Sequence, residues 1–253
     1  MEGCVSNTQN EKAMLILKTA LFLLVHGFQG TNSLWTVSKV AVQAGGSVTI
    51  PCHYHRMFQQ RMKYWCKGRR WNVCRELGRT TSKPRTEGFS ITDYPSEQFF
   101  TITMTNLQEK DTDRYWCAVK RSAWDSVRAS MEVEVTEDPP DLSVRENMVS
   151  VEEGANATIT CSYTDRLKSS EKMWCESGDL LSCKSGLTST TSQEPSFTIA
   201  DDGSGVFNVT VVKLQRKHTG WYWCSAGGLQ APVHINVTRR PDELINITGN
   251  FNT

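Results

Sequence analysis

The chain has 253 residues, enough for two domains of about 100 residues each or for one large domain. Hydrophobic residues make up 38% and charged residues 22%, which excludes a disordered tail and a bundle of membrane helices. The 28 basic and 27 acidic residues leave a net charge of +1, which gives no reason to expect nucleic-acid binding. Nine cysteines without any Cys-x-x-Cys pair favour disulfides and an oxidising compartment.

The N-terminal segment has the pattern of a signal peptide. Residues 13–25 (AMLILKTALFLLV) are apolar apart from Lys18 and Thr19, and they are too few to span a bilayer. A start at Met14 fits better than Met1, because Lys18 then supplies the basic end and the loss of Cys4 leaves an even number of cysteines. We therefore expect 1–33 to be a signal peptide; the alternative is a buried helix of the mature fold.

No later segment is apolar for long enough to span a membrane, so the sequence predicts an extracellular chain without a membrane span. Two alternatives stay open. The chain is secreted, or it is the ectodomain of a plasma-membrane receptor whose membrane helix is missing from this sequence.

One pattern of cysteines and aromatic residues occurs twice. In each copy a Cys is followed after 13 residues by a Trp-Cys pair, then after 8 more by a third Cys, and finally by Tyr-Trp-Cys. The landmarks are Cys52, Trp65-Cys66, Cys74 and Tyr115-Trp116-Cys117 in the first copy, and Cys161, Trp174-Cys175, Cys183 and Tyr222-Trp223-Cys224 in the second. The repeat predicts one domain over 34–136 and another over 137–238, with a proline-containing linker near 136–141 and a polar tail over 239–253.

Segments within each copy alternate between apolar and polar residues, as half-buried strands do. Val48, Ile50 and Cys52 share one face in the first copy. Ala157 and Ile159 begin the same pattern in the second. Short alternating segments at regular spacing, separated by Gly-, Asn- and Asp-rich breaks, predict an all-β sandwich of two antiparallel sheets.

The order Cys, Trp, Tyr-x-Cys resembles the immunoglobulin domain, and the long interval between the outer cysteines resembles its variable type. Lys63-Tyr-Trp-Cys-Lys67, the Cys eight residues later, and the segment 111–117 (DTDRYWC) resemble the polymeric immunoglobulin receptor family and equally the CMRF-like leukocyte receptors. The resemblance implies two tandem variable-type immunoglobulin-like domains, each with an inter-sheet disulfide. These bridges would be Cys52–Cys117 and Cys161–Cys224.

The repeat spacing predicts a second bridge in each domain, Cys66–Cys74 and Cys175–Cys183. Strand geometry supports it, because neighbouring residues face opposite ways: if Trp65 lies in the core, Cys66 lies on the outer face. Cys74 can then lie opposite Cys66 across a tight hairpin.

Some positions depart from the variable-domain pattern. In variable domains an Asp six residues before the last Cys commonly pairs with an Arg at the start of the fourth strand. Asp111 occupies the position of this Asp, but Gly88 or Phe89 stands where the Arg is expected. Arg85 is the possible substitute for that Arg. In the second copy His218 replaces the Asp. The Gly-x-Gly of antigen-receptor joining segments is absent from 126–135, which argues against an antibody or T-cell receptor chain.

The sequence contains no catalytic motif, neither a Gly-x-Ser-x-Gly elbow nor His-Glu-x-x-His nor a phosphate-binding loop. His53 and His55 lie two residues apart and could face one metal ion, but no third ligand is evident, so surface histidines are the better interpretation. We expect no enzymatic activity, no cofactor and no metal.

Cations and aromatic residues gather in the first domain, which holds 16 basic and 10 acidic residues against 8 and 13 in the second. Interleaved cations and aromatics suit an anionic head group or the acidic patch of a protein, although a solvated charged face explains them equally well. The resemblance adds that Trp124-Asp125 looks like a pair that inserts in lipid and helps to bind calcium. The candidate ligand-binding residues are His53, Arg56, Arg61, Lys63, Arg69, Arg70, Trp71, Arg75, Lys120, Arg121, Trp124 and Asp125.

Four Asn-x-Ser/Thr sequons occur at Asn156, Asn208, Asn236 and Asn246, and none lies in the first domain. Chance placement is the alternative to a functional distribution. Strand alternation places Asn156 and Asn208 on the outer face of one sheet and Asn236 on the opposite sheet.

Together these features predict an immune cell-surface receptor ectodomain, or a soluble receptor, that binds an extracellular ligand through domain 1. By resemblance the ligand is an immunoglobulin or an anionic lipid or glycan. The alternative is a secreted lipid- or microbe-binding module without a signalling role, and a hydrolase is a distant third.

Overall fold

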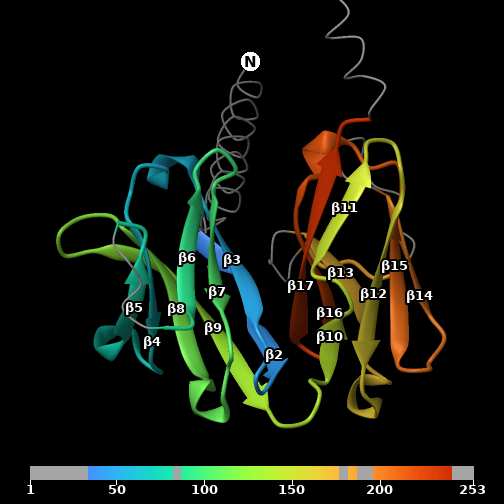
Figure 1. The fold of residues 1–253 in the computed structure, drawn as a ribbon, viewed down its shortest axis with the longest axis horizontal. Helices are drawn as coiled ribbons and strands as arrows, with labels where there is room; N and C mark the ends of the chain where they lie inside the picture. Colours follow the sequence, from blue (N-terminus) through green and yellow to red (C-terminus); the bar gives the residue numbers. More distant parts are fainter. Residues whose placement is uncertain (1–33, 82–86, 177–181, 187–195, 241–253) are drawn as a thin grey trace, which may run out of the picture. The chain divides into compact units, whose positions relative to one another are not determined.

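The structure is a computed structural model that describes residues 34–81, 87–176, 182–186 and 196–240. The predicted signal peptide, Arg85 and Asn246 lie outside the described residues. Residues Leu34–Thr253 fall into one compact unit, which contains two β-sandwiches (Figure 1). None of the described helices is long and apolar enough to cross a membrane.

Domain 1 is a sandwich of a four-stranded and a five-stranded sheet. The four-stranded sheet has the order β1-β3-β7-β6 and the five-stranded sheet the order β2-β9-β8-β4-β5. Pairing is antiparallel except between β2 and β9, which run parallel. The strands are β1 (Leu34–Thr36), β2 (Lys39–Gln43), β3 (Val48–Tyr54), β4 (Lys63–Lys67), β5 (Arg75–Arg79), β6 (Phe89–Tyr94), β7 (Phe99–Met104), β8 (Asp113–Lys120) and β9 (Ser126–Thr136).

Domain 2 repeats this plan with sheets of order β10-β12-β15-β14 and β11-β17-β16-β13. The parallel pair here is β11 with β17. The strands are β10 (Leu142–Val144), β11 (Met148–Glu152), β12 (Ala157–Tyr163), β13 (Lys172–Glu176), β14 (Phe197–Asp201), β15 (Val206–Val211), β16 (Gly220–Ala226) and β17 (Leu229–Thr238). The all-β, two-sandwich architecture predicted from the repeat is confirmed.

A disulfide and a stacked aromatic pair form the centre of each sandwich. Cys52–Cys117 links β3 to β8, and the ring of Trp65 stacks on Tyr115 with centroids 5.2 Å apart. In domain 2 the bridge is Cys161–Cys224, and Trp174 stacks on Tyr222 at 5.3 Å. Because these side chains are buried and largely apolar, they hold the two sheets face to face.

The turn before each last cysteine is held by its own hydrogen bonds. The Tyr115 hydroxyl donates to the Asp111 carbonyl at 2.6 Å, and the Tyr222 hydroxyl donates to the His218 carbonyl at 2.9 Å. The Asp111 side chain also accepts from the Gln108 N–H at 3.1 Å, and it forms an ion pair with Lys67 at 3.6 Å. Lys67, rather than an arginine of the fourth strand, is therefore its described cationic partner.

His218 performs the same capping task as Asp111, because its Nδ1 accepts from the Gln215 N–H at 3.0 Å. Both turns are capping boxes at the start of a short 3-10 helix, η3 (Glu109–Asp111) and η6 (Arg216–His218). The His in place of Asp therefore keeps a side-chain acceptor for the backbone N–H of the capping residue, although the negative charge is lost.

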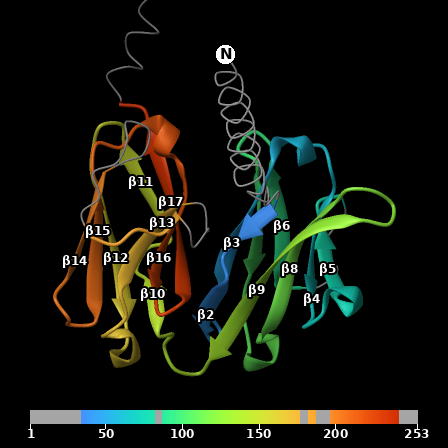
Figure 2. The same ribbon diagram turned by 180° about the vertical axis from the view of Figure 1, so that it is seen from behind.

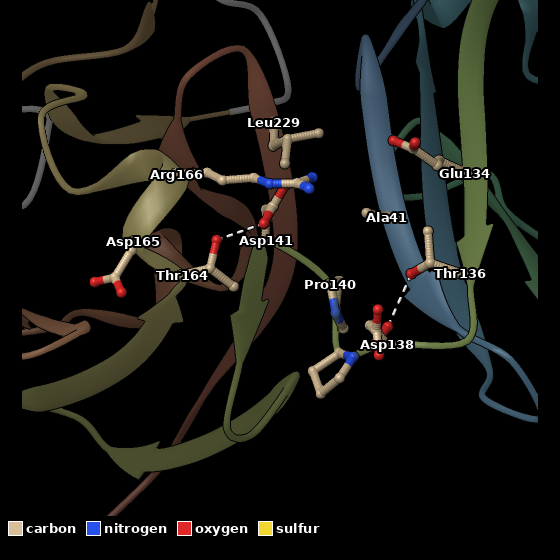
Figure 3. Close-up of a pocket in the computed structure, with 11 residues that line it drawn as sticks. Ala41, Glu134, Thr136, Asp138, Pro140, Asp141, Thr164, Asp165, Arg166 and Leu229 are labelled. Carbon is tan, nitrogen blue, oxygen red and sulfur yellow. Dashed lines mark hydrogen bonds and ion pairs between the residues drawn. The ribbon is translucent and has the colours of Figure 1, made fainter.

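The linker between the sandwiches lies beside an acidic pocket (Figure 3). Asp138 accepts from the Thr136 hydroxyl through its carbonyl at 2.9 Å, and Asp141 accepts from the Thr164 hydroxyl. Arg166 lies 3.5 Å from Asp141 and is largely exposed. The pocket is thus opposite in charge to the cationic candidate site of domain 1.

Candidate ligand-binding site

Apart from His53 and Lys63, the candidate residues of domain 1 fall into two groups at opposite ends of the five-stranded sheet. In the β4–β8 register, Lys63 lies opposite Val119 and Lys67 lies opposite Tyr115. The β3–β4 loop and the β8–β9 turn therefore meet at the Lys63 end, whereas the hairpin closed by Cys66 adjoins the Lys67 end. These residues are predicted together as the ligand-binding set of domain 1, and the structure separates them into two groups.

The β3–β4 loop presents cations and one methionine to solvent. It contains the 3-10 helix η1 (Arg56–Phe58), in which Phe58 is buried while Met57 is 65% exposed. Arg56 and Arg61 are exposed on either side. Met57 was not among the candidate residues predicted from the sequence. Its position between the cations Arg56 and Arg61 could have indicated it.

The β8–β9 turn holds a tryptophan away from the domain. Trp124 is 98% exposed at the tip of this turn, which projects from the sandwich in Figure 2. Two backbone N–H groups, of Arg121 and Ser122, donate to the Asp125 carbonyl at 3.0 and 3.1 Å and close the turn. Lys120, the last residue of β8, is half-buried just before it.

Asp125 is engaged within this turn, because its Oδ2 accepts from Arg121 Nε at 2.7 Å. The described residues contain no cluster of three or more potential metal ligands. The geometry therefore makes Asp125 a brace for the turn that presents Trp124, and the calcium role implied by the resemblance finds no ligand set among them.

The second group lies on the hairpin between β4 and β5, which Cys66–Cys74 closes. Trp71 folds back onto the sheet: its ring lies 6.0 Å from Tyr64 and 5.8 Å from Trp116, and the Arg128 guanidinium lies 5.1 Å from it. Trp71 is consequently half-buried. The neighbouring cations Arg69, Arg70 and Arg75 remain exposed.

Lys63 does not reach the surface, which corrects its prediction as a ligand contact. Its side chain is 0% exposed, and Nζ donates to Asp93 Oδ2 at 2.7 Å and to the Gln59 carbonyl at 2.6 Å. The reason is strand alternation: Lys63 lies two residues before Trp65 and shares its inward face. The alternation was readable in the sequence, but the charge of Lys63 suggested exposure.

His53 also lies away from the two loop groups. Its ring stacks on Trp35 at 5.6 Å and lies 5.7 Å from Phe99 and 6.1 Å from Trp223. Burial lowers the pKa of His53 to about 4, so the imidazole is neutral at pH 7. His55 belongs to the loop instead, where its Nδ1 accepts from the Met57 N–H at 3.4 Å. The two histidines therefore do not share a strand face.

The described residues of domain 2 form no comparable projection at the equivalent end. A two-glycine turn, Gly227 and Gly228, connects β16 to β17, and both glycines have positive φ. A Cβ at Gly227 would lie 2.5 Å from Leu167 and 3.2 Å from Ser170, so this turn packs tightly on its neighbouring loop. The two domains thus share one fold but differ in this turn: the β16–β17 turn of domain 2 packs against its neighbouring loop, whereas the β8–β9 turn of domain 1 exposes Trp124.

The described sequons lie at accessible positions of domain 2. Asn156 and Asn236 are exposed, and Asn208 is half-buried on the outer face of β15. Asn208 Oδ1 accepts from the Thr160 hydroxyl at 2.9 Å. Their placement on the two sheets follows the predicted strand alternation.

Comparison with protein families identifies the type of both domains. The family model "Immunoglobulin V-set domain" matches residues 36–136 and 144–239. The two matches cover most of the chain and coincide with the two sandwiches.

Individual proteins resemble the chain at moderate identity. The polymeric immunoglobulin receptor of Homo sapiens is 28% identical over 208 residues, covering 78% of this chain and 27% of the receptor. CMRF35-like molecule 7 of Mus musculus is 38% identical over 112 residues, covering 43% of this chain and 53% of that protein. The chain thus spans about a quarter of the length of the human receptor.

A solved structure, the ectodomain of a teleost fish polymeric immunoglobulin receptor, is 39% identical. The comparison covers 82% of this chain and 98% of that one, with a TM-score of 0.38.

Proposed function

The chain belongs to the immunoglobulin V-set domain family, and from that premise we propose that domain 1 binds an extracellular immunoglobulin through its β3–β4 loop and its β8–β9 turn. The chain is a receptor-like, non-enzymatic protein of the immunoglobulin superfamily, similar to polymeric immunoglobulin receptors and CMRF35-like molecules. The proposal adds the ligand, its binding surface and an extracellular location, either at the plasma membrane or in solution.

The observation that carries the proposal is the contrast between the two copies. Trp124 is 98% exposed on a braced turn in domain 1, whereas the equivalent turn of domain 2 is closed by Gly227 and Gly228. A single exposed tryptophan with exposed arginines nearby has the composition of an interface hot spot, since Trp and Arg are enriched at such positions. Immunoglobulin is the ligand named in the polymeric immunoglobulin receptors to which the chain is similar.

Surface plasmon resonance on immobilised polymeric immunoglobulin tests the proposal. Trp124→Ala should weaken binding by about 2 kcal/mol, the scale of a hot-spot residue. Met148→Ala is the matched control, because Met148 is an apolar side chain of domain 2 that is 60% exposed. Equal affinities of Trp124→Ala and the unaltered chain would refute binding through this turn.

A second candidate, an anionic lipid surface, is favoured by one observation. Two apolar side chains, Trp124 and Met57, are exposed on the turn and loop of domain 1 together with arginines that suit phosphate head groups. Co-sedimentation with phosphatidylserine vesicles distinguishes the two ligands. Vesicle binding that Trp124→Ala abolishes, without any binding to immunoglobulin, would favour the lipid.

A further inference from the structure

We propose that Lys63 is a positioning residue: from inside domain 1 it fixes the conformation of the β3–β4 loop that presents Met57 and Arg56 to the ligand. This inference rests on the proposed function for its binding consequence, and its structural part stands on the buried cluster around Lys63. It replaces the direct ligand contact that the sequence suggested.

The Lys63 ammonium is fully surrounded by partners from three elements. It donates to the carboxylate of Asp93 on β6 and to the carbonyl of Gln59 in the loop, and it lies 4.2 Å from the ring centroid of Tyr54 on β3. The Tyr54 hydroxyl donates to the other oxygen of Asp93 at 2.8 Å. Because a buried ammonium without partners is unfavourable, the cluster favours the loop conformation that brings the Gln59 carbonyl to it.

Further contacts hold the β3–β4 loop on either side of the Gln59 carbonyl. Phe58 is buried beside Gln59, and the Gln59 side chain donates to the Pro95 carbonyl at 2.7 Å. The N–H groups of Phe58 and Arg61 donate to the carbonyls of His55 and Phe58, both at 2.9 Å. Met57 therefore stands on a short turn whose backbone is tied to the interior through Lys63.

Domain 2 contains the same cluster. Lys172, nine residues after Tyr163 as Lys63 is nine after Tyr54, lies 4.0 Å from the Tyr163 ring centroid and 3.3 Å from Asp201. Its ammonium donates to the carbonyls of the loop residues Leu167, Lys168 and Ser170 at 2.8, 3.0 and 2.8 Å. The loop-fixing arrangement is thus a feature of the repeat, independent of what the loop binds.

Only in domain 1 does this arrangement have a binding consequence. The domain 1 loop carries exposed Met57 next to an open turn, whereas the domain 2 loop is covered at Leu167 by Gly227. A loop fixed before binding loses less conformational entropy when the ligand orders it. Domain 2 consequently offers a matched internal control.

The experiment uses the full chain with two triple variants. One is Tyr54→Phe, Lys63→Met and Asp93→Leu, and the other is the equivalent change in domain 2, Tyr163→Phe, Lys172→Met and Asp201→Leu. Replacing every polar member of a buried ionic cluster by apolar groups is often neutral for stability, so both variants should fold while losing the bond to the loop carbonyls. Lys63→Met with Asp93→Leu, which leaves no unpaired charge and keeps Tyr54, serves if the triple variant does not fold.

Hydrogen exchange and binding to immobilised polymeric immunoglobulin are the two measurements. The domain 1 variant should speed exchange at the Phe58, Gln59 and Arg61 amides by about tenfold or more and weaken binding about tenfold, equivalent to about 1.4 kcal/mol. The domain 2 variant should speed exchange in its own loop and leave affinity within about twofold.

Three results would overturn the inference, and the first two are unchanged exchange at the domain 1 loop and unchanged affinity despite faster exchange. Equal losses of affinity in both variants would also overturn it, because they would indicate a general loss of stability. If the unaltered chain does not bind polymeric immunoglobulin, the proposed function fails instead, and exchange alone decides whether Lys63 fixes the loop.

Discussion

Trp71 packs edge-on against Trp116, with ring centroids 5.8 Å apart, and so joins the tip of the β4–β5 hairpin to the outer face of its own sheet. The Trp116 Nε1–H donates to the Gly68 carbonyl at 2.7 Å, which adds a hydrogen bond to the same contact. The hairpin is therefore held by packing and hydrogen bonding as well as by the Cys66–Cys74 disulfide. Trp71 contributes to the stability of domain 1 before any ligand is present.

Trp71→Ala should lower the free energy of unfolding of domain 1 by about 1–2 kcal/mol, because it removes aromatic pairs worth about 0.5–1.5 kcal/mol each together with buried apolar area. Trp124→Ala is the matched control: the residue is 98% exposed, so stability should change by no more than about 0.5 kcal/mol. Urea unfolding followed by circular dichroism measures both. Equal stabilities of the two variants would contradict the packing role of Trp71.

The fold was predictable because its determinants are local and periodic. Alternation placed Trp65 and Cys52 inside. The structure joins the eight cysteines as expected: the repeat spacing predicted the two hairpin bridges, and the resemblance to immunoglobulin domains implied the two inter-sheet bridges. The same alternation also requires Lys63 to point inward, but residue type was given more weight than position. At that site a paired, hydrogen-bonded charge is compatible with burial.

The candidate site was less predictable, because it depends on contacts between segments distant in sequence. Nothing near Trp71 in the chain shows that its ring returns to Tyr64 and Arg128. The exposure of Trp124 follows from a brace between Arg121 and Asp125 that no periodicity encodes. Composition predicts binding through domain 1, which stays a prediction, and only the three-dimensional structure separates the two cationic ends of that domain.

Acidification should destabilise the chain through His53. The folded state lowers the pKa of His53 from 6.5 to about 4, so between these pH values the unfolded chain binds the proton and the folded chain does not. Stability from this group is therefore complete above about pH 6.5 and falls as the pH decreases toward 4, by up to about 2–3 kcal/mol. His53→Phe keeps a ring against Trp35 and cannot titrate. Urea unfolding at several pH values should show a shallower slope for His53→Phe over this window, and identical slopes would contradict the assignment.

Removal of the hairpin disulfide should leave domain 1 folded. Cys66 and Cys74 close a short loop, and a loop of this length is worth about 2.5 kcal/mol in the chain-entropy description, against about 4 kcal/mol for the long loop of Cys52–Cys117. Cys66→Ala with Cys74→Ala should consequently reduce the melting temperature without loss of cooperativity, since Trp71 still packs on the sheet. Calorimetry measures the transition, and failure of the double variant to fold would show that the hairpin depends on the disulfide.

Expression in a eukaryotic secretory pathway should give glycans on domain 2 and none on domain 1. Asn156 and Asn236 are exposed and Asn208 lies on an outer sheet face, so their side chains are accessible in the folded domain. Intact-mass analysis before and after glycosidase treatment, with each Asn→Gln variant, counts the occupied positions. A glycan on any residue of 34–136 would contradict this distribution.

A comparison of two arginine pairs tests which end of domain 1 binds the ligand. Arg56 and Arg61 flank Met57 at the loop end, whereas Arg69 and Arg70 lie on the hairpin at the opposite end, and all four are exposed. Changing either pair to alanine removes two positive charges, so the long-range electrostatic attraction to the ligand falls equally and only the local contacts differ.

Arg56→Ala with Arg61→Ala should weaken binding to polymeric immunoglobulin by about 1–2 kcal/mol. This loss should decrease at high salt, because exposed charges are screened over about 8 Å. Arg69→Ala with Arg70→Ala should cost about 0.5 kcal/mol or less. Surface plasmon resonance at two salt concentrations compares them, and a larger loss from the hairpin pair would move the binding surface to the Cys66–Cys74 end.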